Sequence, residues 1–268
     1  MNSPLPSRFR VVGAAANREW LSHRLNRFAY AHLALVLLAG LLPLLTPADA
    51  LARGAAWWLL HAVLYALSLS SLLLGLSSAQ AEADEFVLLL GQPRGLGPWL
   101  TGKAVALLLL VGITSSLLIA PVALAGAFSP SLLLVATGAA GISTVGAMIG
   151  LCAGFWIRDS IRGLITVVAC WFGLLFGTDL LLLGVAGAPW VQQHPDLWVA
   201  TLMLNPLDAF RVTVLFEVEQ AAFAGLRIHG LAQWWIGHAS FWLGTLLVVW
   251  TAALGGLAWL GARRRLDN

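Results

Sequence analysis

Charged side chains are scarce in this sequence: Asp, Glu, Lys and Arg make up 10% of its 268 residues, whereas 60% of the residues are hydrophobic. Together with a mean hydropathy of +0.87, this balance excludes an ordinary soluble enzyme and a nucleic-acid-binding domain. Cysteine is nearly absent as well, because Cys152 and Cys170 are the only two and both lie in apolar runs. The sequence therefore contains neither a disulfide framework nor a thiolate metal site.

Long apolar runs dominate the sequence instead. Each of six runs is long enough to cross a hydrocarbon layer of ~30 Å at ~1.5 Å per residue, and Asp179 is the only acidic or basic residue within them. They lack the polar–apolar alternation of a membrane barrel, so we expect helices. The sequence predicts an all-α integral membrane protein, a single transmembrane permease domain over residues 1–268. Its six predicted transmembrane helices cover about residues 28–45, 56–79, 104–127, 131–157, 163–188 and 239–262.

Basic residues fall mostly on one side of these spans. With both termini in the cytoplasm, only Arg53, Arg211 and Arg227 of the 15 Lys and Arg residues lie outside, which is the bias expected of inner loops. The first span follows an Arg-rich leader and ends without a small-residue cleavage site, which predicts a retained helix and not a signal peptide. We expect a multi-pass protein of a bacterial-type cytoplasmic (inner) membrane with both termini cytoplasmic.

Two segments outside the spans have amphipathic patterns. Residues 8–24 place apolar side chains such as Phe9 and Trp20 at helical spacing, which predicts an N-terminal interfacial helix in the inner headgroup layer; a disordered basic leader is the alternative. Residues 210–226 are too apolar for a solvated loop, so we expect a re-entrant or interfacial helical segment that lies on or partly enters the outer leaflet. Five tryptophans near the predicted outer boundary indicate an aromatic belt: Trp190, Trp198, Trp234, Trp235 and Trp242.

The stretch 97–104 matches the GxxxxGK spacing of a P-loop. A P-loop also needs a preceding strand, an α/β domain and a Ser or Thr after the lysine to hold magnesium. Here Ala104 follows Lys103 and opens a membrane span. We therefore predict that this chain binds no nucleotide, and that Lys103 anchors the inner interface with its side chain reaching toward water.

Other reactive residues form no recognisable catalytic or metal pattern. His32, His61 and His238 lie in or beside spans without the pairing that haem ligation needs, and Ser77 and Ser78 have no nearby histidine or oxyanion-hole signature. The chain has only three methionines and two cysteines, which is no ladder of soft ligands for Cu(I). The sequence predicts no catalytic residue, no metal site and no cofactor bound by this chain.

The loop between the second and third spans begins with acidic residues, continues with apolar residues 86–90 and reaches a proline. Negative charge at the start favours a short helix that stops before the proline. Because a leucine cluster exposed on a cytoplasmic loop usually has a partner, we predict a cytoplasmic coupling helix; a solvated loop is the alternative. The candidate docking residues are Glu82, Asp84, Glu85, Leu89, Leu90 and Pro93.

A second motif, at residues 204–211, follows the fifth span. Asn205 can cap a helix whose first residue is Pro206, with Asp208 in the first turn. Helix initiation is one interpretation of this motif, and a direct functional role for Asp208 or Arg211 is the other.

Asp179 is the lone carboxylate within a span, where it would cost ~2.5–3.5 kcal/mol at the bilayer centre. Its place about 16 residues along the fifth span, or ~24 Å, puts it toward the outer side. We consider a hydrated or hydrogen-bonded interfacial aspartate and a gating or translocation role.

Glycines recur at the spacing of one helical turn in two spans. Small residues at this spacing allow close helix approach in lipid, where packing drives association. The candidate packing residues are Gly146, Gly150 and Gly154 in the fourth span and Gly173 and Gly177 in the fifth.

The loop between the second and third spans and the motif at residues 204–211 resemble those of a known family. The acidic residues, leucine run, proline and Gly102-Lys103 spacing resemble the coupling loop of ABC-2-type permeases, the membrane subunits of one class of ATP-binding-cassette transporters. The motif at Asn205 is similar to the Asn-Pro-x-Asp-x-aromatic-Arg element of the Nos-type branch, which is encoded with the nitrous oxide reductase maturation machinery. The resemblance covers the six-span plan, but Phe86 and Val87 stand where such permeases usually have a Gly/Thr pair.

The resemblance implies an ABC transporter permease that works as a homodimer with a separate ABC ATPase subunit, which holds the ATP and magnesium. ATPase closure would push on residues 80–100, and the fifth span would face the second permease copy. The Nos-type version implies action on a periplasmic accessory protein in copper-site maturation. Besides these partners we expect the lipid bilayer and no nucleic acid. The alternative is a self-sufficient secondary transporter or membrane adaptor, which predicts paired intramembrane charges or inverted repeats.

Overall fold

The computed structural model describes residues 8–24, 26–47, 51–81, 96–185, 187–219 and 230–267. Within these ranges the chain is helical and contains no strand, which confirms the predicted all-α class. The helices are α1 Arg8–His23, α2 Arg27–Leu41, α3 Leu51–His61, α4 Ser68–Ala81, α6 Leu96–Leu124, α7 Pro130–Trp156, α8 Ser160–Phe172, α9 Thr178–Val185, α10 Pro189–Gln192, α11 Pro195–Leu204, α12 Pro206–Val218 and α14 Gly230–Asp267. A 3-10 turn, η1 Leu42–Leu45, extends α2, and π-helical turns, η2 Ala62–Leu67 and η3 Gly173–Gly177, join α3 to α4 and α8 to α9.

Six helical stretches are long and apolar enough to cross a membrane, and each coincides with one predicted span. The sixth departs furthest, because α14 begins at Gly230, ahead of the predicted start at 239. In the third, α6 already begins at Leu96, ahead of the predicted start at 104. The extra residues include Pro98, which a helix tolerates in its first turn because the amides there have no intrahelical partner. The GxxxxGK stretch is therefore part of a continuous helix and not a phosphate-binding loop.

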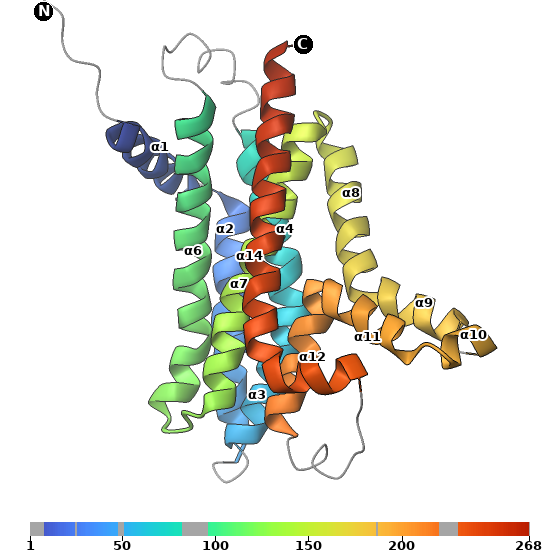
Figure 1. Cartoon of the computed structure of the whole chain (residues 1–268). Coiled ribbons are helices and arrows are strands. Elements are labelled where there is room, and N and C mark those ends of the chain that lie inside the picture. Colours follow the sequence, from blue (N-terminus) through green and yellow to red (C-terminus); the bar gives the residue numbers. More distant parts are fainter. Residues whose placement is uncertain are drawn as a thin grey trace, which may run out of the picture.

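The spanning helices run side by side, and the first described helix, α1, lies at the same end of the bundle as the end of α14 (Figure 1). The α7–α8 link is at this end too, which we call the terminal end. An even number of crossings, as predicted, produces this arrangement. That this end faces the cytoplasm remains a prediction from the distribution of the basic residues.

The closest helix contact is a seam between α4 and α7. A methyl group built at Gly150 would lie 1.9 Å from Leu72 O, and one at Gly75 would lie 1.9 Å from Ala147 O. At Gly146 and Gly154 the same atom would lie 2.4 Å from Ser71 Oγ and Ala79 Cβ, respectively. The two backbones thus touch where side chains are absent, which confirms the predicted packing role of the glycines in α7.

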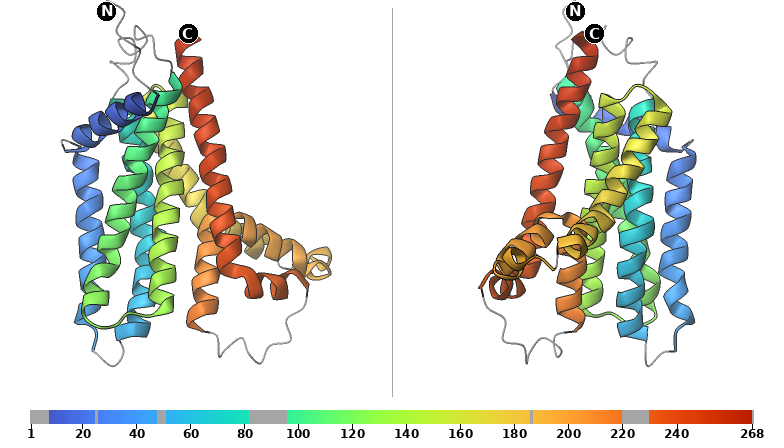
Figure 2. Two further views of the ribbon diagram at one scale, coloured as in Figure 1. Left: turned by 60° about the vertical axis from the view of Figure 1, so that its left-hand side comes forward. Right: turned by 90° about the vertical axis from the view of Figure 1, so that its right-hand side faces the viewer.

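Two parts of the chain run across the bundle axis. Helix α1 lies across the terminal end, and α9, α10 and α11 project sideways before α12 turns along the axis again (Figures 1 and 2). The bend between α11 and α12 is 106°. Helix α12 has a largely buried first half and packs against α7 and α14, so this part of the predicted 210–226 segment enters the bundle and does not lie on its surface.

Helix α14 bends near its start, at His238, where φ is −130° and ψ is 18°. The His238 Nδ1 donates to Trp234 O at 2.9 Å. The side chain thus binds the carbonyl oxygen that would accept a backbone hydrogen bond in a regular helix. Of the tryptophans predicted to form a belt, Trp190 and Trp234 are exposed, but Trp235 is 2% exposed and packs on Phe216. Trp235 is therefore a core residue, which corrects the prediction for this position.

Candidate functional site

The outer motif is organised by the side chain of Asn205. Its Oδ1 accepts from Leu207 N at 3.1 Å, which confirms Asn205 as the cap of α12. The Nδ2 lies 2.7 Å from Asp208 Oδ2, 3.0 Å from Thr178 Oγ1 and 2.6 Å from Leu174 O, three acceptors that share its two hydrogens. One amide thus joins the start of α12 to the π-helical turn between α8 and α9.

Arg211, one turn further along α12, joins two carboxylates. Its Nη1 and Nη2 donate to Asp179 Oδ2 and Oδ1 at 3.0 and 2.9 Å, and Nη2 lies 2.9 Å from Asp208 Oδ1. The two-pronged contact fixes the start of α9 against α12. The Arg211 and Asp179 side chains are 37% and 45% exposed, whereas that of Asp208 is 3% exposed. We call Asp179, Asn205, Asp208 and Arg211 the outer cluster.

The structure therefore brings together residues that the sequence left apart. Asp179 is hydrogen-bonded, which supports that interpretation of it; the gating role stays a prediction. Arg211 lies within α12, as the predicted helix start at Pro206 implies, and it pairs with a residue 32 positions earlier, which the sequence did not predict. The signal that could have found the pair was a lone acidic residue and a lone basic residue, each inside an apolar stretch.

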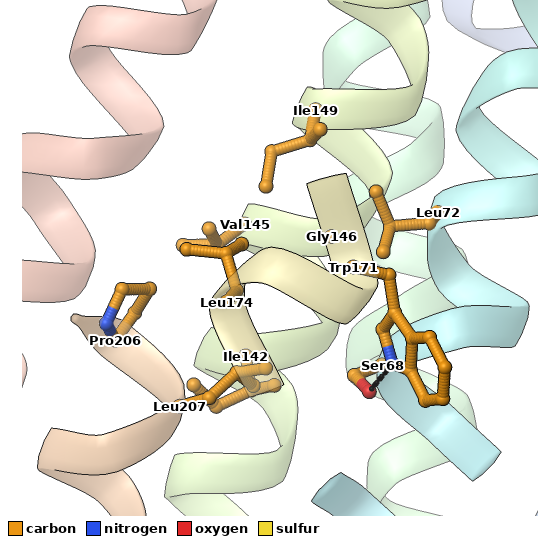
Figure 3. A pocket seen from close by; sticks show the side chains of 10 residues that line it. All are labelled: Ser68, Leu72, Ile142, Val145, Gly146, Ile149, Trp171, Leu174, Pro206 and Leu207. Carbon is orange, nitrogen blue, oxygen red and sulfur yellow. Dashed lines mark hydrogen bonds between the residues drawn. The ribbon is translucent and has the colours of Figure 1, made fainter. Parts of the chain in front are cut away.

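A small apolar hollow borders the outer cluster where α4, α7, η3 and α12 meet (Figure 3). Its volume of about 10 Å³ is at the lower limit for one water molecule, so it is no binding site for a larger ligand. Trp171 Nε1 donates to Ser68 Oγ across it at 2.9 Å. Its lining residues are Ser68, Leu72, Ile142, Val145, Gly146, Ile149, Trp171, Leu174, Pro206 and Leu207.

A second group of charges lies at the terminal end of the bundle. Lys103 Nζ, on α6, donates to Glu19 Oε2, on α1, at 2.6 Å, and these side chains are only 2% and 3% exposed. Ser78, near the end of α4, donates to Glu19 Oε1, and His23 Nε2 lies 3.3 Å from the same oxygen. We call Glu19, His23, Ser78 and Lys103 the inner cluster. Lys103 does not reach toward water, and the prediction of a snorkelling anchor is therefore wrong.

The partners of Glu19 keep it ionised although it is buried. Burial alone would raise its pKa, but the nearby imidazole of His23, the charge and hydrogen bond of Lys103 and the hydroxyl of Ser78 together lower the pKa to about 2. An ionised carboxylate in this place is stable only with such partners, because an unpaired buried charge is strongly unfavourable. The inner cluster is therefore an ionic connection among α1, α4 and α6.

Close backbone packing accompanies this ionic connection. A methyl group built at Gly102 would lie 2.5 Å from Ala15 Cβ and 2.7 Å from Val12 O, so α1 approaches α6 at a glycine. Helix α1 confirms the prediction that residues 8–24 are helical and not a disordered leader. Its packed face carries Glu19 and His23, however, while Phe9 is 90% exposed, so the contact with the bundle is partly ionic and not only apolar.

Several predicted site residues are not part of either cluster. The docking residues Glu82, Asp84, Glu85, Leu89, Leu90 and Pro93 lie outside the described residues. A methyl group built at Gly173 or Gly177 would meet nothing within 4 Å, so these two glycines pack against no helix of the same copy in the described part of the chain.

The histidines and serines considered for chemistry have structural partners. His32 is buried, with Nδ1 2.7 Å from Ser70 Oγ and Nε2 3.1 Å from Thr114 Oγ1. Ser77 donates to Leu74 O, and Ser78 belongs to the inner cluster. Within the described ranges, no group of three or more His, Cys, Asp or Glu side chains is arranged to hold a metal ion.

Comparison with known proteins adds no assignment: no protein-family model and no curated protein sequence matches this chain.

Proposed function

We propose that this chain is the membrane-spanning permease subunit of an ABC-2-type ABC transporter of the inner membrane, with ATP hydrolysed by a separate ATPase subunit. The observation that carries the proposal is the inner cluster. It ties α1 to α4 and α6, the two helices that flank residues 82–95 and the predicted docking residues within them. A force that an ATPase applies to this segment therefore acts on helices that are already connected.

The helix packing supports a route from this end to the other. Helix α4 contacts α7 along the glycine seam, and α7 contacts α12, which holds Asp208 and Arg211 of the outer cluster and is capped by Asn205. Closely packed helices move as rigid elements, so a displacement of α4 is passed on to the outer cluster through α7. The output at the outer face is transport or, by the Nos-type resemblance, mechanical action on a periplasmic partner in copper-site maturation.

The docking step is tested by co-expressing this chain with a candidate ABC ATPase subunit and measuring whether the two co-purify. Leu89→Asp with Leu90→Asp removes the apolar anchor, which is worth roughly 3–6 kcal/mol before the costs of association, and we expect the ATPase to be lost. Glu82→Lys is the matched control, because a rim charge affects mainly the association rate, and more so at low salt. A folded double variant that retains the ATPase and its stimulation would contradict the proposal.

A second copy is the other partner that we propose, and α8 offers the means to test it. Cys170 is exposed on α8, one turn before Gly173, and both Gly173 and Gly177 are unpacked within the described chain. In a Cys152→Ser background, mild oxidation should cross-link two copies through Cys170 in membranes. A cysteine placed at Thr137, exposed on α7, provides the comparison. Equal cross-linking at both positions would indicate random collision and not a dimer at α8.

The alternative of a self-sufficient secondary transporter has one observation in its favour. Such a protein is expected to contain paired charges within its helices, and Asp179 with Arg211 is a pair of this kind. The alternatives differ in their need for the ATPase. Substrate movement by the purified chain alone in vesicles with an ion gradient would favour the secondary transporter, whereas movement only with ATPase and ATP supports the ABC permease.

A further inference from the structure

Two hollows flank the bend of α14 at the end of the bundle opposite the terminal end. The first, which we call the apolar groove, lies between α11 and α14 and has a volume of about 520 Å³. Ala200, Met203, Leu204, Leu231, Trp234 and Trp242 line it. Trp242 Nε1 donates to Met203 O at 2.9 Å, so the one polar atom of that ring faces the protein and not the groove.

The second, which we call the polar hollow, lies between α12 and α14 and has a volume of about 430 Å³. Its lining includes a carboxylate, an imidazole and two hydroxyl groups together with aromatic rings. These polar and aromatic lining residues are Thr213, Phe216, Glu217, His238, Ser240 and Phe241. Both volumes fall in the range of about 300–1,000 Å³ that is typical of ligand pockets.

A pair of stacked rings connects the linings of the two hollows. Trp234 lines the apolar groove and His238 lines the polar hollow, and their ring centroids are 4.9 Å apart at an interplanar angle of 14°. Asp196 Oδ1, on α11, accepts from Leu231 N at 3.2 Å and so fixes the wall of the groove to the start of α14. An apolar and a polar compartment in contact match a ligand that is itself half apolar and half polar.

The charge of the polar hollow determines which polar group fits. Glu217 is partly buried and, among the described residues, forms no hydrogen bond or ion pair. A carboxylate beside the rings of Phe216 and Phe241 attracts an ammonium group through both a charge-assisted hydrogen bond and cation–π contact. The Ser240 hydroxyl, on the α14 side of the same hollow, is exposed and can donate to a phosphate oxygen.

We propose that the apolar groove and the polar hollow form one binding site for a bilayer phospholipid with a primary-amine headgroup. An acyl chain occupies the groove, and the ammonium group binds Glu217. The bilayer supplies such a molecule directly to a chain that spans it. A primary ammonium donates a hydrogen bond to the carboxylate, which a quaternary ammonium cannot do, and an anionic headgroup is repelled. The site does not depend on an ATPase, so it can be tested independently of the transporter proposal.

The test uses the purified, delipidated full chain in detergent, titrated with phosphatidylethanolamine, phosphatidylcholine and phosphatidylglycerol of identical acyl chains and followed by native mass spectrometry. We expect phosphatidylethanolamine to bind at least about tenfold more tightly than phosphatidylglycerol, as a charge-assisted hydrogen bond requires. Glu217→Gln should abolish this preference. Glu219→Gln, an exposed carboxylate just beyond the end of α12, is the matched control and should retain it.

Two further arms examine the acyl chain. Ala200→Phe fills the apolar groove and should weaken binding of all three lipids several-fold while circular dichroism stays unchanged. Glycerophosphoethanolamine, which has the headgroup without chains, should not displace the bound lipid. Equal binding of phosphatidylethanolamine and phosphatidylglycerol, or equal behaviour of Glu217→Gln and Glu219→Gln, would overturn the headgroup assignment. Displacement by glycerophosphoethanolamine, or unchanged binding by Ala200→Phe, would overturn the assignment of a lipid.

Discussion

The inner and outer clusters both connect helices through charged side chains, but they differ in burial and in the number of charges. Each ties a helix that runs across the bundle to one that runs along it: α1 to α6 through Glu19 and Lys103, and α9 to α12 through Asp179 and Arg211. The inner pair is almost fully buried, with one acid opposite one base. In the outer cluster one arginine serves two carboxylates, and the Arg211–Asp179 pair remains more than one third exposed.

This difference predicts different tolerance to change. Removing one partner of a buried pair leaves the other charge without compensation, whereas an exposed pair is screened and contributes little to stability. When Asp179 is replaced, Arg211 still has Asp208 as its ion-pair partner. We therefore infer that the inner cluster is a fixed anchor, and that the outer cluster can exchange partners without unfolding the bundle.

Lys103→Met should have the largest effect. It leaves the ionised Glu19 buried without its base, and we expect a loss of about 3–5 kcal/mol in the free energy of unfolding. Thermal unfolding of the purified protein measures the change. The double variant Glu19→Leu with Lys103→Met should recover most of the lost stability, because no buried charge remains. A single variant as stable as the wild type would show that the inner pair is not an anchor.

Acid should weaken the inner cluster selectively. Glu19 has a folded-state pKa of about 2, below its ordinary value of 4.5, so its contribution is complete above about pH 4.5 and is lost as the pH falls toward 2. The difference corresponds to about 3 kcal/mol. Unfolding measured from pH 6 to pH 2 should therefore show a steeper loss for the wild type than for Glu19→Leu with Lys103→Met. Parallel pH curves for the two proteins would contradict the lowered pKa.

The spans and the capping residue could be predicted from the sequence, but the two ion pairs could not. A span is a contiguous pattern, and Asn205 before Pro206 is a local signal, so both can be read along the chain. Lys103 and Glu19 are 84 residues apart, and their contact depends on how α1 lies across the bundle. A hint existed, because Lys103 is the only lysine and Glu19 the only acidic residue before Asp49.

The same distinction applies to the glycines. Their spacing identified close packing but not the partner helix, because spacing describes one helix only. Gly146, Gly150 and Gly154 pack on α4, whereas Gly173 and Gly177, with similar spacing, lie in a π-helical turn where an added methyl group would meet nothing within 4 Å. The π-helical turn itself has no clear sequence signal, since its residues are as apolar as their neighbours.

Gly150→Ala tests the seam that lies between the two clusters. The added methyl group would lie 1.9 Å from Leu72 O, so the backbones must separate, and we expect a loss of about 1–3 kcal/mol in thermal unfolding. If α4 and α7 connect the clusters, ATPase stimulation should fall as well. Gly112→Ala on α6 is the matched control, because its methyl group meets nothing within 4 Å and should leave stability unchanged. Equal effects of the two variants would rule out the seam as the special contact.

Asp179→Asn should have the smallest effect on stability and is the sharpest test of the contrast. The Asp179 side chain is 45% exposed, and Arg211 still has Asp208 Oδ1 at 2.9 Å after the change. Because no charge is left alone, we expect a loss of about 1 kcal/mol or less in thermal unfolding. If the Asp179–Arg211 pair also has the predicted gating role, substrate movement or partner maturation should fall several-fold while ATPase binding is retained. Asp159→Asn, which changes an exposed helix cap on α8, controls for the loss of one negative charge on the same helical stretch. A loss of stability as large as that of Lys103→Met would show that the outer cluster is a second fixed anchor. If both activity and stability stayed unchanged, Asp179 would be a hydrogen-bonded interfacial residue without a gating role.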